Sequence, residues 1–258
     1  MGAYRIDRTL VIPRDCDLQL VGDGASEVAT RLVWAGPAEG VLLRIEGPSQ
    51  ATIRDLQILA ASSAAMLVES PDRAGDQIFV DQLNTNGPTG QSHGRTAALR
   101  VTGFENTALQ FRALQGNGNG GTWVEVIGRG NDGNTGSTIA VYTGATGTAA
   151  GQYNVKQGGR LVVRGVYHER SSDSLNGLHL TDSGVLSIDA TRFSYATSET
   201  APTVAADNFR GVFTLVTCIL MPVQTQETCR FELRGDGTRA SVLALNNQFW
   251  VQKPGTTA

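Results

Sequence analysis

The sequence predicts an all-β protein, a single-stranded right-handed parallel β-helix of roughly eight to ten coils. Two observations predict this solenoid: a unit that repeats four times in the second half of the chain, and apolar residues that alternate with polar ones upstream of it. Repeats of this length are typical of stacked architectures, in which each unit buries its apolar side against its neighbours. We expect residues 1–258 to form one such domain.

The repeated unit begins with two apolar residues two positions apart, followed by a small or polar residue and then a large apolar one. Its four copies begin at Leu161, Leu186, Phe213 and Leu243, at intervals of 25, 27 and 30 residues. The small or polar positions are Gly165, Ala190, Thr217 and Asn247, and the large apolar positions are Tyr167, Phe193, Leu220 and Trp250. Alternation at period two predicts strands with one buried side, and we expect each copy to stack on the next.

Shorter stretches upstream follow the same two-residue step, at 78–80, 99–101, 124–126 and 139–141. Gly, Asn and Thr gather between the strand-like stretches, and these residues favour the positive φ angles of sharp turns. A β-sandwich is the alternative, with short strands at roughly 8–12-residue spacing joined by hairpins. The same bend recurring in successive copies favours the solenoid.

The composition is that of a folded chain without a strong electrostatic partner. Hydrophobic residues make up 40% and charged residues 17%, and the net charge of −3 comes with no Lys/Arg cluster that would indicate nucleic-acid binding. No apolar run approaches the ~20 residues of a membrane-spanning helix. The first ten residues have no apolar signal core, so we expect any secretion signal to lie upstream or to have been removed.

The chain has three cysteines, Cys16, Cys218 and Cys229. No CxxC or Cys/His spacing indicates zinc. A disulfide between Cys218 and Cys229 is possible if the chain is exported. The apolar surroundings of Cys218 instead favour buried free thiols, and we expect these.

A distinctive phrase of apolar residues, glycines and one proline occupies residues 2 to 34. Its positions are Gly2, Tyr4, Ile6, Leu10, Ile12, Pro13, Leu18, Leu20, Gly22, Gly24, Thr30 and Leu32. The phrase resembles the first coils of the pectate-lyase-like β-helix superfamily, over core and turn positions only. That superfamily includes polysaccharide lyases, glycoside hydrolases, epimerases, phage tailspikes and adhesion stalks. The resemblance therefore implies a polysaccharide partner, met outside the cell or at its surface, without implying an activity.

In that superfamily an amphipathic helix usually plugs the N-terminal end of the column, whereas here the phrase begins at residue 2. Ends of solenoids present apolar surface and unpaired strands. The resemblance thus implies a segment of a longer protein without its N-terminal cap, or copies that associate end to end or side by side.

The densest group of chemistry-bearing residues follows Tyr167. If Tyr167 points into the core, His168 and Arg170 flank it on the outside, and a neighbouring coil adds Tyr142 or Tyr153. A polysaccharide lyase needs a base such as Tyr or His and a cation that stabilises the developing negative charge. Tyr142, His168 and Arg170 are the candidate catalytic residues. The alternative is a solvated strand end that closes into a polar turn.

Two further places are candidates for substrate binding. Trp123 and Glu125 are predicted outward neighbours of buried valines, and an exposed Trp would stack on a sugar ring. His93 and Arg95 lie in a predicted loop over residues 84–96, and long loops on rigid scaffolds often bind ligands. The alternatives are that Trp123 packs beneath the preceding loop and that the loop is merely exposed.

Paired carboxylates for a hydrolase are harder to find. Asp55, Asp81 and Asp189 each lie near a predicted strand bend, but not at equivalent positions in adjacent copies. No acidic cluster indicates a metal site, so we predict no metal and no cofactor, with calcium expected only if the chain is a lyase.

Two functions remain open. Low charge and only 16 Phe, Trp and Tyr residues favour a non-catalytic β-helix segment, structural or glycan-binding, of a larger secreted, surface or phage tail protein. The resemblance favours a lyase or hydrolase that acts on an acidic polysaccharide in a cleft on the β-helix.

Overall fold

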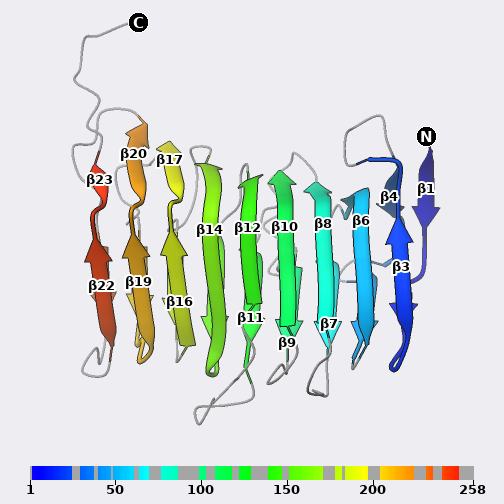
Figure 1. The fold of residues 1–258 in the computed structure, drawn as a ribbon, viewed down its shortest axis with the longest axis horizontal. Helices are drawn as coiled ribbons and strands as arrows, with labels where there is room; N and C mark the ends of the chain where they lie inside the picture. The colour runs from blue at the N-terminus through cyan, green and yellow to red at the C-terminus, as the bar shows by residue number, and fades with distance from the viewer. Residues whose placement is uncertain are drawn as a thin grey trace, which may run out of the picture.

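The chain folds into a solenoid built of strands alone. The computed structural model describes residues 2–24, 30–37, 40–47, 49–60, 64–69, 77–86, 99–102, 108–117, 122–128, 139–146, 151–170, 178–181, 184–196, 204–223, 231–234 and 240–249. Figure 1 shows the strands lying side by side along the long axis, from β1 at the N-terminal end to β22 and β23 at the other. No helix occurs in these ranges.

The largest sheet, sheet A, runs the length of the solenoid. Its strands in spatial order are β1 (Ala3–Ile6), β4 (Arg31–Trp34), β6 (Gln50–Leu59), β8 (Gln77–Asn86), β10 (Ala108–Asn117), β12 (Ile139–Thr146), β14 (Gly159–Arg170), β16 (Gly184–Asp189), β19 (Val212–Val216) and β22 (Ser241–Leu245). Strand β3 (Asp17–Val21) pairs with β6, and β17 (Arg192–Ala196), β20 (Ile219–Val223) and β23 (Gln248–Phe249) follow one another beside β14.

Two further sheets complete the coils. Sheet B contains β2 (Leu10–Ile12), β5 (Val41–Glu46), β7 (Ala64–Glu69), β9 (Leu99–Thr102), β11 (Thr122–Ile127) and β13 (Gly151–Lys156). Sheet C contains β15 (Leu178–Thr181), β18 (Val204–Asp207) and β21 (Phe231–Arg234), and β15 lies beside β13. From β5 to β16, successive strands alternate between sheet A and one of the other two sheets, so each of these coils crosses both sides of the solenoid.

Every strand pair in the described part of the chain is parallel. The register stacks one position of nine successive strands, Leu18, Ala51, Ile78, Leu109, Ile139, Leu161, Leu186, Phe213 and Val242. The predicted parallel β-helix is therefore confirmed, and the sandwich alternative, which needs antiparallel hairpins, is excluded for these strands.

Alternate residues of each strand fill the interior. Leu161, Val163, Leu186, Ile188 and Leu215 are completely buried, as the repeat predicts. In the central strands of sheet B, apolar residues two positions apart are buried. They are Met66 and Val68, Leu99 and Val101, and Val124 and Val126. Stacking these residues removes one continuous apolar column from water, which no single coil could do alone.

Sheet A bends at one residue in six of its described coils. The bend residues Asp55, Gln82, Gly165, Ala190, Thr217 and Asn246 all have φ between 47° and 67°. Positive φ is uncommon outside glycine, so the packing of the coils imposes this backbone conformation on the bend residues. The residue after the bend points inward: Leu56, Leu83, Val166, Thr191 and Cys218 are buried.

The structure corrects the register of the last predicted repeat. Phe213 pairs with Val242 rather than with Leu243, and the bend residue is Asn246 rather than Asn247. Tyr167 pairs with Arg192, whereas Phe193 pairs with His168. Tyr167 and Phe193, which were predicted to be equivalent, are thus displaced by one residue in the register. Phe249 pairs with Leu220, and Trp250 lies outside the described residues.

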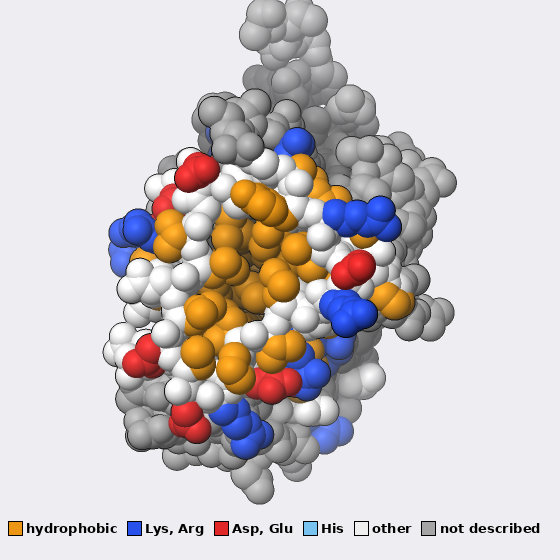
Figure 2. Space-filling view, turned by 90° about the vertical axis from the view of Figure 1, so that its right-hand side faces the viewer, with side chains coloured by type: hydrophobic (Ala, Val, Ile, Leu, Met, Phe, Trp, Pro, Cys, Tyr) orange, Lys and Arg blue, Asp and Glu red, His pale blue; other side chains and the backbone are white. Residues whose placement is uncertain are grey.

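Both ends of the described solenoid expose apolar side chains. Figure 2 looks onto the end that carries the N-terminus and shows an apolar centre within a rim of polar and charged groups. The exposed large apolar residues at this end are Tyr4, Val11, Leu18 and Val21, and those of the last described coils are Val212, Val242, Leu243 and Leu245. None of the described elements is a helix with the length and apolar character needed to cross a membrane.

Candidate functional site

On the outer face of sheet A, one strand position carries charged residues in most successive coils, and where a bend residue is described this position directly precedes it. The register stacks Arg54, Asp81, Arg112, Tyr142, Arg164 and Asp189 in successive coils, a set that we call the outer column. Neighbouring strands lie about 4.8 Å apart, so residues of adjacent coils are within reach of each other's side chains.

Asp81 and Arg112 form the most enclosed ion pair of this column. The Arg112 guanidinium donates to Asp81 Oδ2 and lies 5.6 Å from the centre of the Phe79 ring. The hydrogen bond and charge of Arg112 lower the pKa of Asp81, against the effect of burial. The Asp81 side chain is only 9% exposed, whereas that of Arg112 is 60% exposed. The guanidinium therefore covers the carboxylate and faces solvent.

Arg164 and Asp189 repeat the arrangement further along. Arg164 Nε lies 3.4 Å from Asp189 Oδ2, and Thr217 Oγ1 donates to Asp189 Oδ1 at 2.9 Å. The three side chains come from β14, β16 and the bend that follows β19. Arg164 is 66% exposed, so here too a guanidinium is presented to solvent.

Two more exposed arginines lie on the same sheet. Arg160 is on β14 with Arg164, and Arg192 on β17 stacks over the half-buried Tyr167 ring at 5.3 Å from its centre. Tyr167 is half-buried beneath Arg192 and therefore does not lie in the core. From the sequence, His168 and Arg170 are predicted on the outside on the condition that Tyr167 points into the core, and this condition is not met. We call Arg112, Arg160, Arg164 and Arg192 the arginine face.

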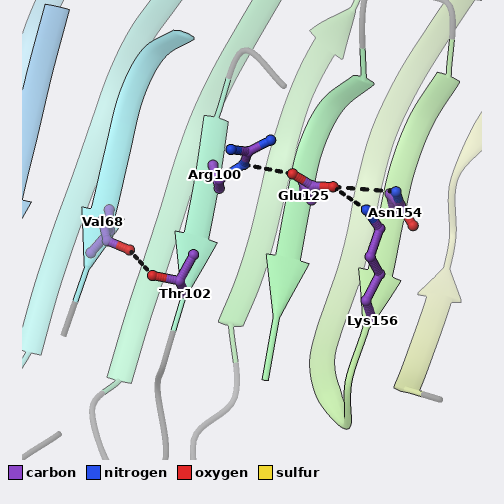
Figure 3. A network of polar contacts seen from close by, with 6 residues as sticks. All are labelled: Val68, Arg100, Thr102, Glu125, Asn154 and Lys156. Carbon is purple, nitrogen blue, oxygen red and sulfur yellow. Dashed lines mark hydrogen bonds and ion pairs between the residues drawn. The ribbon is translucent and has the colours of Figure 1, made fainter. Parts of the chain in front are cut away.

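The outer side of sheet B contains a different arrangement, in which one carboxylate is enclosed by two cations (Figure 3). Glu125 on β11 accepts a hydrogen bond of 2.6 Å from Arg100 Nε and one of 2.7 Å from Lys156 Nζ. Asn154 Nδ2 lies 3.4 Å from the same carboxylate. These partners come from the coil before and the coil after, so Glu125 links three coils. Its side chain is 7% exposed.

Burial alone raises the pKa of Glu125. The hydrogen bond from Lys156 and the charges of Arg100 and Lys156 together outweigh burial, and the net pKa is lowered. A carboxylate held ionised in this way accepts hydrogen bonds but does not donate a proton near neutral pH. Glu125 was predicted as a sugar contact, and the structure places it in an ion-pair network whose two oxygens are already engaged.

The backbone positions of the three predicted catalytic residues are all described. Tyr142 lies in the outer column, in register between Arg112 and Arg164. His168 pairs with Thr146 and Phe193, four residues beyond the Arg164 position, and Arg170 pairs with Tyr195. Four residues correspond to about 13 Å along a strand. Tyr142 and His168 therefore lie on adjacent coils without being stacked in register.

The remaining predicted positions are only partly described. Trp123 lies on β11, directly before the buried Val124. His93, Arg95 and Cys229 lie outside the described residues. Cys218 is a buried free thiol, as predicted, and its Sγ lies 3.3 Å from the Val216 carbonyl oxygen. Burial raises the pKa of the Cys218 thiol, so this cysteine is a packing residue rather than a nucleophile.

The predicted acidic residues do not form a pair. Asp81 and Asp189 share the outer column but are separated by the coils of Arg112, Tyr142 and Arg164, and Asp55 is a bend residue. In the described ranges, no group of three or more His, Cys, Asp or Glu side chains could hold a metal ion.

Sequence reasoning missed the outer column, although the repeat contains a signal for it. In three successive copies of the repeat the residue directly before the bend is Arg164, Asp189 and Val216. A residue at that position lies on the outer side, because the residue directly before it is buried. Reading this position upstream would have selected Asp81 and Arg54, each of which directly precedes a bend residue.

The fold and this geometry define a parallel β-helix protein. A scan against protein-family models and a search of curated proteins find no match. Among solved structures, the chain is similar to the catalytic domain of a GH87 α-1,3-glucanase in complex with tetrasaccharides, at 12% identity and a TM-score of 0.41, covering 95% of this chain and 53% of that one.

A second similar structure is the A-module of the mannuronan C-5 epimerase AlgE4 from Azotobacter vinelandii, at 10% identity and a TM-score of 0.33, covering 100% of this chain and 89% of that one. The chain thus spans about half the length of the glucanase domain. No residue role is transferred from either protein.

Proposed function

We propose that the chain is a non-catalytic, glycan-binding β-helix segment of a larger protein that is secreted, displayed on a surface or built into a phage tail. In this proposal the stacked coils are a rigid scaffold, and the outer face of sheet A holds a saccharide chain. A flat sheet whose side chains repeat once per coil suits a polymer with a regular repeat.

The state of the enclosed carboxylates supports a non-catalytic role. Asp81 and Glu125 each have a lowered pKa and are each held by cationic side chains of other coils. A glycosidase needs a carboxyl group whose pKa is raised, so that it is protonated and can give its proton to the leaving oxygen. These two carboxylates instead have the character of structural ion-pair partners.

The proposal is tested by assaying binding and turnover together. The protein is incubated with uronate polymers and with neutral glucans, with and without added calcium. Affinity electrophoresis measures retention, while ultraviolet absorbance and reducing-end assays measure cleavage. We expect retention by at least one glycan and no product from any of them. Unsaturated product or new reducing ends would overturn the proposal.

A polysaccharide lyase is the second candidate, and one observation favours it. The register places Tyr142 between two residues with exposed guanidinium groups, Arg112 and Arg164. A phenol as base between arginines that bind a uronate carboxylate is a workable lyase arrangement. In this candidate the base is Tyr142 rather than His168. Tyr142→Phe would then abolish product formation while leaving retention unchanged.

End-to-end association of copies is a separate part of the proposal. The exposed apolar residues at the two described ends, such as Leu18 and Leu245, would become buried if a second copy continued the stack. A head-to-tail contact of this kind forms open filaments rather than closed rings. We expect sedimentation to show assembly that increases with protein concentration, and Leu18→Lys to prevent it. A constant monomer would exclude this association.

A further inference from the structure

The arginine face differs in charge from the rest of the chain. The sheet-A strands β8, β10, β12, β14, β16 and β17 contain five arginines and three acidic residues, a balance of +2. The whole chain has a net charge of −3. The middle of this sheet is therefore a basic region on an acidic protein, which attracts and orients an anionic ligand.

The ion pairs within this region leave guanidinium N–H groups facing outward. Arg112 is 60% exposed and lies over the buried Asp81, and Arg164 is 66% exposed beside Asp189. Each guanidinium has five N–H donors, more than one aspartate can accept. The aspartates fix the arginines in place, which lowers the entropy cost of binding a further carboxylate or sulfate.

The spacing of these arginines selects the kind of anion. Arg112 and Arg164 stand two coils apart in one column, a separation of about 10 Å between their backbones. A single nucleic-acid strand carries a charge about every 3.4 Å, far more densely than this column can match. A polymer with more widely spaced charges and flat apolar ring faces fits better, since Tyr167 and Phe79 also lie on this side.

We infer that the arginine face, Arg112, Arg160, Arg164 and Arg192, is a binding site for a carboxylate-bearing polysaccharide that lies along the solenoid axis. This inference rests on the proposed function and specifies its ligand class. One carboxylate would accept hydrogen bonds from Arg112 and another, two coils further along, from Arg164, with Arg192 on the coil after Arg164. Sulfated glycans share the relevant chemistry and are distinguished by experiment.

The test compares two double variants of equal charge. Arg164→Gln with Arg192→Gln removes two arginines from the face. Arg8→Gln with Arg44→Gln removes the exposed Arg8 and Arg44, whose side chain is 41% exposed, from elsewhere on the solenoid. Retention is measured in gels that contain polygalacturonate, alginate, dextran sulfate, dextran or an oligothymidylate. Circular dichroism melting of each variant confirms that it is folded.

We expect the wild type to bind polygalacturonate or alginate, and the Arg164/Arg192 variant to bind at least about tenfold more weakly, because each hydrogen bond between charged groups contributes on this scale. The Arg8/Arg44 variant should bind like the wild type. Retention should decrease with rising salt concentration. Adding Asp81→Asn and Arg112→Gln to the face variant should weaken binding further without leaving the buried carboxylate unpaired.

Equal loss in both double variants would overturn the inference, because binding would then follow net charge alone. Tighter binding of the oligothymidylate, or of dextran sulfate than of both uronate polymers, would overturn it in favour of that ligand. Retention by dextran alone would overturn the inference and leave the proposed function intact. Cleavage of a uronate polymer would instead overturn the non-catalytic function, whatever the arginine variants do.

Discussion

Sheets A and B both tie neighbouring coils together with ion pairs that bury the carboxylate and leave the cation nearer the surface, but they differ in how far the cation is exposed. On sheet A an arginine covers an aspartate, so Arg112 faces solvent above the buried Asp81. On sheet B two cations enclose one glutamate, so the charge of Glu125 is neutralised by ion pairs within the protein. The sheet A guanidinium, at 60% exposure, is thus more open to a ligand than the sheet B cations, at 36% and 34%.

The largest effect is expected where the carboxylate is most enclosed. Glu125→Ala leaves Arg100 and Lys156 side by side without their shared partner, and we expect it to lower the free energy of unfolding by about 2–4 kcal/mol. Chemical denaturation followed by circular dichroism measures this loss. Glu69→Ala is the matched control, because Glu69 is half exposed and pairs with Arg44 at 2.9 Å. It should cost less than about 1 kcal/mol. Equal losses would mean that burial does not distinguish the two pairs.

An intermediate effect is expected from acid on the sheet A pair. The pKa of Asp81 is lowered in the folded protein, so its ionised form contributes stability above the unfolded pKa, near 4, and that contribution is lost as pH falls through the folded value. Asp81→Asn should therefore reduce the loss of stability between about pH 6 and pH 3. Thermal melting at a series of pH values measures it. If both proteins lost stability in parallel, Asp81 would not be held ionised by Arg112.

The smallest effect is expected at the most exposed pair. Arg164→Gln should change the free energy of unfolding by less than about 0.5 kcal/mol, because Arg164 is largely solvated and Asp189 keeps its hydrogen bond from Thr217. Any difference should vanish at about 1 M salt, where the Debye length is about 3 Å, whereas the Glu125 effect should persist. A large loss of stability would make Arg164 a structural residue and would remove it from the arginine face as a binding group.

The fold was predictable because burial in a stacked coil imposes period two on the sequence. Leu161, Val163, Leu186 and Ile188 are buried as the alternation requires. The last repeat was misplaced because both phases are apolar there, with Val242, Leu243 and Leu245 all in one stretch, and because two asparagines in succession suit the bend equally well. Only pairing with Phe213 decides between them.

The site was less predictable because its contacts depend on coil lengths. Glu125 meets partners 25 and 31 residues away, and Arg112 meets Asp81 across 31 residues. These separations differ from coil to coil, so no fixed spacing identifies the partners in advance. Interest in Tyr142 and His168 also rested on residue type alone, whereas register places Tyr142 between arginines and His168 opposite Phe193.

The column of bend residues has a consequence for how such a chain can change in length. From the outer column to the buried corner the chain takes two residues in every coil that shows the bend, as from Asp81 to Leu83, from Arg164 to Val166 and from Val216 to Cys218. The connection from sheet A to sheet B varies: four residues separate β6 from β7, and twelve separate β8 from β9. Insertions are therefore tolerated in the connections between the sheets, while the bend within sheet A admits none. New loops grafted between those sheets would leave the spacing of the arginines unaltered.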